Sequence, residues 1–163
     1  MIAVVEFFVD SLSEQDTTLL GEHLAHVLEP GQIIALNGQL GSGKTNLIRA
    51  IGIALGIDPD RINSPTFVLL QLYEDGRLPV AHFDTYRLAD SDEFLAIGGD
   101  EYLHGGEFVC LIEWAERIAE ILPADHLTIK VEQTGECSRR FHFRSWGEHS
   151  DRLANALQQR TSG

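Results

Sequence analysis

One eight-residue segment, residues 38–45, constrains the fold of this chain more than any other. Its sequence matches the pattern Gly-x-x-x-x-Gly-Lys-Ser/Thr in full. The residues are Gly38, Gln39, Leu40, Gly41, Ser42, Gly43, Lys44 and Thr45. An apolar run precedes them at residues 33–36, and apolar residues at helical spacing follow within residues 44–55. The segment is therefore predicted to be a P-loop, a phosphate-binding turn between a buried strand and a helix.

Each residue type in this loop has a physical reason. Glycines let the backbone turn tightly and bring N–H groups up to phosphate oxygens, where the start of the next helix adds its positive dipole end. Lys44 can place a charge on the outer phosphates, and the Thr45 hydroxyl can ligate Mg²⁺. The motif thus predicts binding of ATP with Mg²⁺ by all eight residues. A chance glycine-rich turn is the alternative.

The rest of the chain alternates strand-like and helix-like segments, which is typical of an α/β fold. We expect a P-loop NTPase-like mixed sheet flanked by helices, in a single P-loop ATPase domain over residues 1–163. Asp-Gly at residues 75–76 predicts a hairpin. Strands are expected at residues 2–9, 33–36, 67–73, 78–83, 108–112, 127–131 and 140–146, and helices at residues 13–28, 44–55, 91–97 and 148–159.

The charge balance bears on the partners. The chain has 12 basic and 25 acidic residues and a net charge of −13. A protein that binds nucleic acid directly needs Lys and Arg side chains to neutralise the phosphates, and this chain has few of them. We therefore expect any nucleic acid to be held by a partner protein; the alternative is that acidity only aids solubility. No apolar run approaches the ~18–20 residues of a membrane helix, and the N-terminus lacks a signal-peptide pattern.

The cysteines and histidines give no metal signal. Cys110 and Cys137 have no metal-type spacing, and Cys110 lies in an apolar run, as a core residue would. The histidines are scattered, and His82, on an expected strand, is more typical of a packed or capping residue than of a catalyst. Together these features predict a cytoplasmic protein without membrane association.

Two acidic residues directly follow expected strands. Glu113 follows residues 108–112, and Asp84 follows residues 80–83. Open α/β sheets place their ligands at such strand ends, so either carboxylate could hold the metal or orient an attacking water. Exposed strand-end acids are the alternative.

A loop at residues 64–66, Ser-Pro-Thr, lies where a P-loop protein senses the γ-phosphate, and Thr66 could reach metal or phosphate. A turn fixed by proline is the alternative. Arg87 could approach phosphate or pair with an acid. The chain has neither Asn-Lys-x-Asp nor Asp-x-x-Gly, the usual GTPase motifs, and Arg117 is the only arginine in residues 114–138, so no arginine-rich kinase lid is evident. These absences favour ATP without a small-molecule acceptor.

Four segments together resemble the TsaE (also called YjeE) family of ATPases. They are residues 36–45 around the P-loop, Ser-Pro-Thr-Phe at 64–67, His-Phe-Asp-Thr-Tyr-Arg-Leu at 82–88 and Ile-Glu-Trp at 112–114. They occur in the family's order and at about its spacing, and Thr17 stands four residues before Gly21 as in the family. The resemblance extends from about residue 13 to residue 117.

This resemblance implies an ATPase required to make threonylcarbamoyladenosine next to the anticodon of tRNA. It implies action on a complex of two proteins, TsaD and TsaB, with tRNA contacted only through that complex. The implied site roles are phosphate binding by Lys44, Mg²⁺ binding by Thr45 and Glu113, proximity of Thr17 to adenine, a mobile switch at residues 64–67, a catalytic or metal-linked acid at Asp84, and a functional aromatic at Trp114. A core tryptophan is the alternative for Trp114.

One departure and two alternatives stay open. The family more often has an arginine soon after the glycine at position 135, whereas this chain has Glu136-Cys137-Ser138 before Arg139 and Arg140. A nucleotide contact there is therefore left unassigned. Because no arginine finger is evident, hydrolysis is expected to be slow alone and stimulated by partners. A small-molecule kinase is the first alternative function, and a non-catalytic nucleotide sensor is the second.

Overall fold

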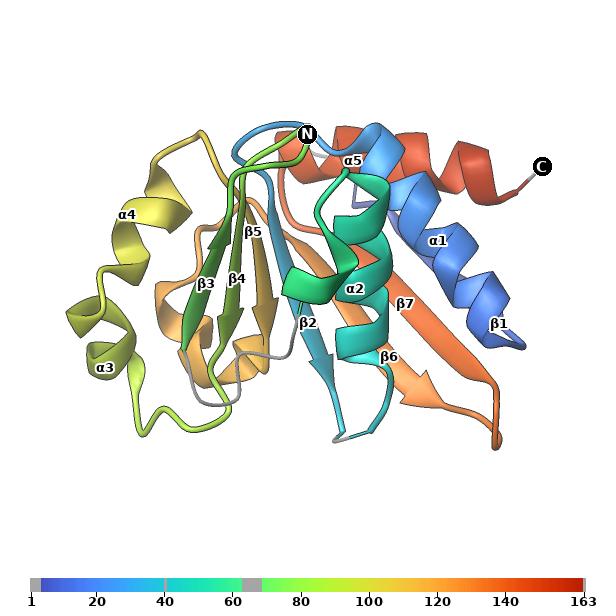
Figure 1. The fold of residues 1–163 in the computed structure, drawn as a ribbon, viewed down its shortest axis with the longest axis horizontal. Helices are drawn as coiled ribbons and strands as arrows, with labels where there is room; N and C mark the ends of the chain where they lie inside the picture. The colour runs from blue at the N-terminus through green and yellow to red at the C-terminus, as the bar shows by residue number, and fades with distance from the viewer. Residues whose placement is uncertain (1–3, 40, 63–68, 163) are drawn as a thin grey trace.

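The computed structural model describes residues 4–39, 41–62 and 69–162, and it consists of a seven-stranded sheet with helices on both faces (Figure 1). The strands are β1 (Glu6–Ser11), β2 (Ile33–Gly38), β3 (Leu70–Tyr73), β4 (Val80–Asp84), β5 (Val109–Glu113), β6 (Leu127–Gln133) and β7 (Arg139–Ser145). The helices are α1 (Glu14–Val27), α2 (Lys44–Ala54), α3 (Ser91–Ala96), α4 (Gly99–His104) and α5 (Glu148–Thr161), with 3₁₀ segments η1 (Pro59–Arg61) and η2 (Ala115–Ile121).

The sheet is mixed, as predicted. Its strand order is β1-β7-β6-β2-β5-β4-β3. Four central strands, β6, β2, β5 and β4, are parallel to one another. The pairs β1–β7, β7–β6 and β4–β3 are antiparallel. The parallel arrangement brings the carboxyl ends of β2, β4 and β5 to one edge of the sheet, where α/β proteins bind ligands.

Two apolar layers hold this sheet. The central strands are buried on both faces, which is why β2 and β5 are almost continuously apolar rather than alternating. One core joins the sheet to α1, α2 and α5, and the other joins it to α3, α4 and η2 (Figure 1). Cys110 belongs to the second core, as expected, and burial raises the pKa of its thiol to about 12.

Local signals set the helix boundaries. Ser13 caps α1, because its hydroxyl accepts a hydrogen bond from the backbone N–H of Asp16. The sequence also places the start of α2 correctly at Lys44, directly after the P-loop. None of the helices in the described ranges is long and apolar enough to cross a bilayer.

Three local predictions differ from the structure. The predicted β3–β4 hairpin is present, but its loop spans residues 74–79 rather than 74–77, because β4 begins at Val80 rather than at residue 78. The reason is tertiary: the backbone N–H of Arg77 donates to the carbonyl of Leu55 at 2.6 Å, which ties the loop to the end of α2. Strand β1 begins at Glu6 rather than residue 2, among the residues described, and α4 and η2 were not predicted.

Candidate active site

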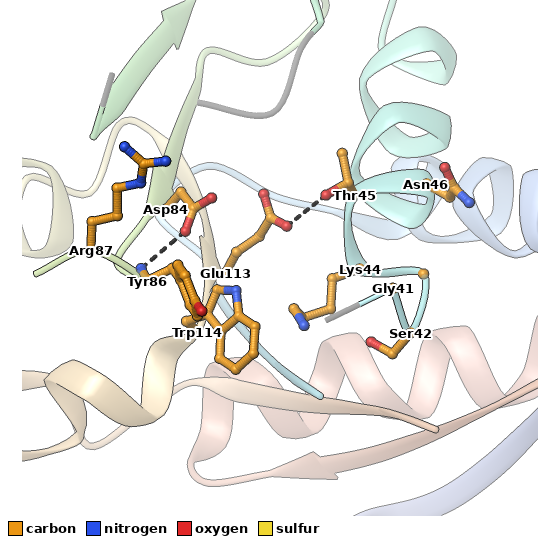
Figure 2. Close-up of a pocket in the computed structure, with 11 residues that line it drawn as sticks. Gly41, Ser42, Lys44, Thr45, Asn46, Asp84, Tyr86, Arg87, Glu113 and Trp114 are labelled. Carbon is orange, nitrogen blue, oxygen red and sulfur yellow. Dashed lines mark hydrogen bonds between the residues drawn. The ribbon is translucent and has the colours of Figure 1, made fainter. Parts of the chain in front are cut away.

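The carboxyl ends of three parallel strands converge on one cavity. In the sheet register Glu113 lies beside Leu36 on one side and beside Asp84 on the other. The end of β2 therefore delivers the P-loop next to both acidic residues. Figure 2 shows this cavity, of about 260 Å³, between the loop and the strand ends. Its lining residues are Gly41, Ser42, Gly43, Lys44, Thr45, Asn46, Asp84, Tyr86, Arg87, Glu113 and Trp114.

The P-loop has the backbone geometry that its glycines permit. Gly38 has φ +152° and a Cβ there would lie 2.6 Å from the carbonyl oxygen of Val131, so no larger residue fits. Gly43, with φ +112°, is the left-handed residue before α2. The N–H of Ser42 donates to the carbonyl of Gln39 at 3.0 Å. Gly43, Lys44, Thr45 and Asn46, at the start of α2, line the cavity, and the start of a helix is where backbone N–H groups lack partners within the helix and can bind an anion.

The amine of Lys44 is enclosed by the loop and by one aromatic ring. Lys44 Nζ donates to the carbonyl oxygens of Gly38 at 2.5 Å and Gln39 at 3.0 Å. The same atom lies 4.0 Å from the centroid of the Trp114 ring (Figure 2). Burial lowers the pKa of Lys44, and the negative charges of Glu113, Glu116 and Asp84 oppose that effect. The cation thus sits among acceptors that a phosphate oxygen can replace.

Thr45 and Glu113 are in direct contact. The Thr45 hydroxyl donates to Oε1 of Glu113 at 2.7 Å, although 68 residues separate them in sequence. The other carboxylate oxygen, Oε2, lies 2.8 Å from Nε2 of His82. Glu113 is only 3% exposed, and hydrogen bonds at both carboxylate oxygens fix its orientation at the end of β5.

Asp84 faces the same cavity from the neighbouring strand (Figure 2). Its Oδ1 accepts a hydrogen bond from the backbone N–H of Tyr86 at 3.0 Å. Burial raises the pKa of Asp84 and the negative charge of Glu113 adds to the rise, whereas the Tyr86 hydrogen bond and the positive Lys44 oppose it. A carboxylate with a raised pKa in a cleft is a candidate proton acceptor.

Trp114 is held in an unusual backbone conformation. It is the one non-glycine among the described residues with positive φ, at 59°. The Thr85 hydroxyl fixes it by hydrogen bonds to the carbonyl oxygens of Glu113 at 3.0 Å and Trp114 at 2.6 Å. The Trp114 ring packs on Tyr86, with centroids 4.8 Å apart, and forms a wall of the cavity. Trp114 is thus partly exposed at the cavity rather than fully buried in a core.

A second cavity, of about 630 Å³, adjoins the first at Gly43 and Asn46. Thr17 lines it, with its hydroxyl 2.7 Å from that of Ser11. Arg139 lines it from β7, and Arg139 Nε lies 3.4 Å from where a Cβ on Gly43 would be. The two cavities thus lie side by side along the same loop, and the second is the larger of the two.

The oxygen donors fit Mg²⁺ bound together with phosphate. Mg²⁺ usually takes one or two carboxylates, several waters and the phosphates, rather than an all-protein cage. The Thr45 hydroxyl and the Glu113 and Asp84 carboxylates are such donors, and no group of three or more His, Cys, Asp or Glu forms a metal cage among the residues described. The buried hydroxyl of Ser42 also has no hydrogen-bond partner among those residues. Phosphate is a group that could satisfy it.

Most of the residues predicted from sequence meet at this place. Lys44, Thr45, Asp84, Glu113 and Trp114 line the first cavity, and Thr17 lines the second. Gly41, Ser42 and Gly43 line the first cavity as well, while Gly38 and Gln39 contact Lys44 through their carbonyls. Leu40 and Thr66 lie outside the described residues. Arg87 also lines the first cavity, and in Figure 2 Asp84 lies between the Arg87 guanidinium and the P-loop.

Sequence reasoning left some contacts unassigned. Arg139 was left open because its position after Gly135 departs from the usual pattern. His82 was interpreted as a packed or capping residue, and its contact with Glu113 needs the strand register to be known. Thr85 stands inside a recognised motif, but its two hydrogen bonds to β5 could not be read from that motif.

Comparisons with known proteins agree on one family. Residues 11–141 match the family model described as threonylcarbamoyl adenosine biosynthesis protein TsaE. The chain is 36% identical over 149 residues to the tRNA threonylcarbamoyladenosine biosynthesis protein TsaE of Bacillus subtilis, covering 91% of this chain and 92% of that protein. It is 41% identical over 129 residues to the protein of the same name from Treponema pallidum, covering 79% and 93%. The crystal structure of YdiB from B. subtilis superposes with a TM-score of 0.81 at 31% identity, covering 98% of this chain and 99% of that one.

Proposed function

Because the chain belongs to the TsaE family of threonylcarbamoyl adenosine biosynthesis proteins, we propose that it is the Mg²⁺-dependent ATPase of that pathway. In this proposal the chain is one P-loop ATPase domain over residues 1–163. It acts in the cytoplasm through a TsaD–TsaB complex and is required to modify the adenosine next to the tRNA anticodon. It contacts tRNA only through that complex.

The observation that carries the proposal is the hydrogen bond between Thr45 and Glu113. It joins the last residue of the P-loop to an acid at the end of a neighbouring parallel strand. In P-loop NTPases a Ser or Thr and a strand-end acid have this relation around Mg²⁺. Because Thr45 donates its proton to Glu113, the lone pairs of its hydroxyl remain available to a cation.

Each residue then has a role in hydrolysis. The N–H groups of the loop and the start of α2 bind the phosphates, and Lys44 exchanges its two carbonyl acceptors for phosphate oxygens. Bound Mg²⁺ would neutralise charge on the phosphates. Asp84 orients the attacking water and accepts its proton, which its raised pKa favours. Thr17 and Arg139, in the second cavity, contact the adenosine end of ATP.

The chain itself offers little to neutralise charge in the transition state. Lys44 donates to two carbonyl oxygens of the loop, whereas Arg87 lines the first cavity from the end of β4 and Arg139 lines the second cavity. An arginine finger is worth roughly 10³–10⁵ in rate in enzymes that use one. Slow hydrolysis alone and strong stimulation by TsaD–TsaB follow from this.

The test is phosphate release from Mg·ATP by the purified protein, alone and with TsaD–TsaB. The variants are Lys44→Ala, Glu113→Gln and Asp84→Asn, with Glu107→Gln, an exposed acid away from the cavity, as the matched control. We expect stimulation by the pair that all three site variants lose and that the control keeps.

Two other outcomes would overturn the proposal. Transfer of labelled phosphate to a metabolite would identify a small-molecule kinase. Full tRNA modification by Glu113→Gln and Asp84→Asn, with loss only in Lys44→Ala, would identify a nucleotide sensor without hydrolysis.

A further inference from the structure

A buried histidine, which does not line the cavity, contacts the carboxylate of the candidate metal ligand Glu113. His82 is 0% exposed, and its Nε2 lies 2.8 Å from Oε2 of Glu113, which is itself 3% exposed. The contact links the middle of β4 to the end of β5, across 31 residues of sequence. His82 does not line either cavity described above, and the hydrogen bond that joins it to a lining residue of the first cavity is the one to Glu113.

The direction of this hydrogen bond follows from its partners. An ionised carboxylate only accepts hydrogen bonds, so the proton between the two groups belongs to Nε2 of His82. The Thr45 hydroxyl donates to the other oxygen of the same carboxylate at 2.7 Å. Glu113 is therefore held at both oxygens, by His82 at Oε2 and by Thr45 at Oε1. Its carboxylate plane cannot rotate without breaking one of the two bonds.

The surroundings of His82 give no other reason for an imidazole. In the sheet it lies beside Leu111 of β5 and opposite Gln71 of β3. Its second ring nitrogen, Nδ1, is buried and has no hydrogen-bond partner among the described residues. A buried polar atom without a partner is unfavourable, and an apolar side chain would avoid it. The interaction that offsets this cost is the bond to Glu113.

We infer that His82 is a positioning residue. Its hydrogen bond occupies Oε2 of Glu113, so that Oε1 is the carboxylate oxygen directed at Thr45 and the metal. The inference rests on the proposed function for the role of Glu113. Histidine–carboxylate contacts behind a metal site orient the ligand, and their loss typically weakens metal affinity by roughly 10–100-fold.

The test measures metal affinity rather than activity. Mn²⁺, which can replace Mg²⁺ and is visible by electron paramagnetic resonance, is titrated into protein with ATP. In His82→Leu we expect the Mn²⁺ dissociation constant to rise at least roughly tenfold. In His82→Gln, whose amide can donate from about the position of Nε2, we expect a rise of less than roughly threefold. ATP binding in EDTA stays unchanged in both variants, because His82 does not line the nucleotide cavities.

His82→Asn is the matched polar control, because its shorter amide cannot reach Oε2 of Glu113. It should behave like His82→Leu if position matters and like His82→Gln if polarity alone matters. Melting temperatures of the variants show whether each is folded. Equal Mn²⁺ affinity in folded wild type, His82→Leu and His82→Asn would overturn the inference.

A second measurement needs no variant. In protein with ¹⁵N-labelled histidine, two-bond ¹H–¹⁵N spectra identify which ring nitrogen of His82 carries the proton. We expect a protonated Nε2, and its signal should shift in Glu113→Gln. A neutral ring protonated at Nδ1 alone would contradict the inference. If instead wild-type protein binds no Mn·ATP while Nε2 is protonated, the proposed function fails and the contact itself stands.

Discussion

At the scale of single residues, Asp84 is where folding and chemistry conflict most directly. Burial and the nearby negative charge of Glu113 raise its pKa, so the folded chain disfavours its ionised form. The proposed reaction needs this carboxylate ionised beside the P-loop. Sites of this kind are often destabilising to the fold that contains them.

Replacing Asp84 by Asn should therefore stabilise the nucleotide-free protein while it strongly slows hydrolysis. Asn has the same shape and its amide oxygen can still accept the hydrogen bond from the N–H of Tyr86. We expect stimulated hydrolysis to fall by roughly 10²–10³. We expect the melting temperature at neutral pH in EDTA to rise, as measured by calorimetry.

The pH dependence gives the control for Asp84→Asn. Because the folded pKa of Asp84 lies above its ordinary value of 3.8, the folded wild type holds an extra proton between these two values. Its stability therefore falls as pH rises through that window, and the variant lacks this loss. The gain in melting temperature should be largest at neutral pH and shrink towards pH ~4. A constant or inverted difference would show that charge burial is not the cause.

At the scale of elements, the close approach of α1 and α2 shapes the second cavity. A Cβ added at Gly21 of α1 would lie 2.4 Å from the Cβ of Ala50 in α2, closer than real atoms approach. Thr17 and Ala50, one from each helix, both line that cavity. The spacing of the two helices and the width of the cavity are thus set by one glycine.

Gly21→Ala should destabilise the protein despite the better helix propensity of alanine. Propensity favours the change by about 1 kcal/mol, whereas overpacking a tight helix contact costs about 1–3 kcal/mol. We expect a net loss of up to about 2 kcal/mol and a weaker ATP affinity, measured by denaturant unfolding and by calorimetric titration. Adding Ala50→Gly should restore part of both, because it removes the Cβ contact but leaves the Ala50 backbone carbon 2.9 Å from the added methyl. Leu19→Ala, an exposed change on α1, should affect neither strongly. If Ala50→Gly gives no recovery, the contact does not set the cavity.

Element by element, the sequence predicts what local chemistry decides. The Ser13 cap, the P-loop and the apolar strand at β5 follow from short patterns, and the structure has them at or within a residue or two of the expected places. Helix α4 and segment η2 are too short to show apolar residues repeating at helical spacing, so no sequence pattern predicted them. The loop at residues 74–79 differs because a distant helix end binds it.

The site follows the same division. Lys44 and Thr45 are predictable from one motif, and strand-end acids can be nominated from the apolar runs before them. That Glu113 meets Thr45, and that His82 stands behind it, depends on strand order and register, which no local pattern specifies. Arg139 reaches the P-loop because β7 runs antiparallel to β6, again a non-local fact.

At the scale of the whole molecule, the net charge limits which ligands the protein can bind without partner proteins. With a net charge of −13, the surface repels a polyanion at long range, whereas the proposed phosphate site needs only backbone N–H groups and one lysine. Such a chain suits a pathway on tRNA only if other subunits hold the tRNA.

We predict that the isolated protein binds tRNA no better than ~10⁻⁴ M even at ~50 mM salt, whereas TsaD–TsaB with this protein binds it and weakens as salt rises to ~200 mM. Fluorescence anisotropy of labelled tRNA measures both. A double-stranded DNA of equal length serves as the control for non-specific binding. Micromolar, salt-sensitive tRNA binding by this chain alone would contradict the prediction.

The bond between Thr45 and Glu113 also has a meaning for how the chain folds. It spans 68 residues, and it can form only after β2 and β5 have aligned in parallel, a slow, non-local step. The P-loop and its helix are local and can form early, but in isolation they lack the acids from β4 and β5. The proposed metal site therefore forms with the central sheet rather than with the motif. A nascent chain that ends before residue 113 contains every residue of the P-loop but lacks the carboxylate proposed to hold Mg²⁺.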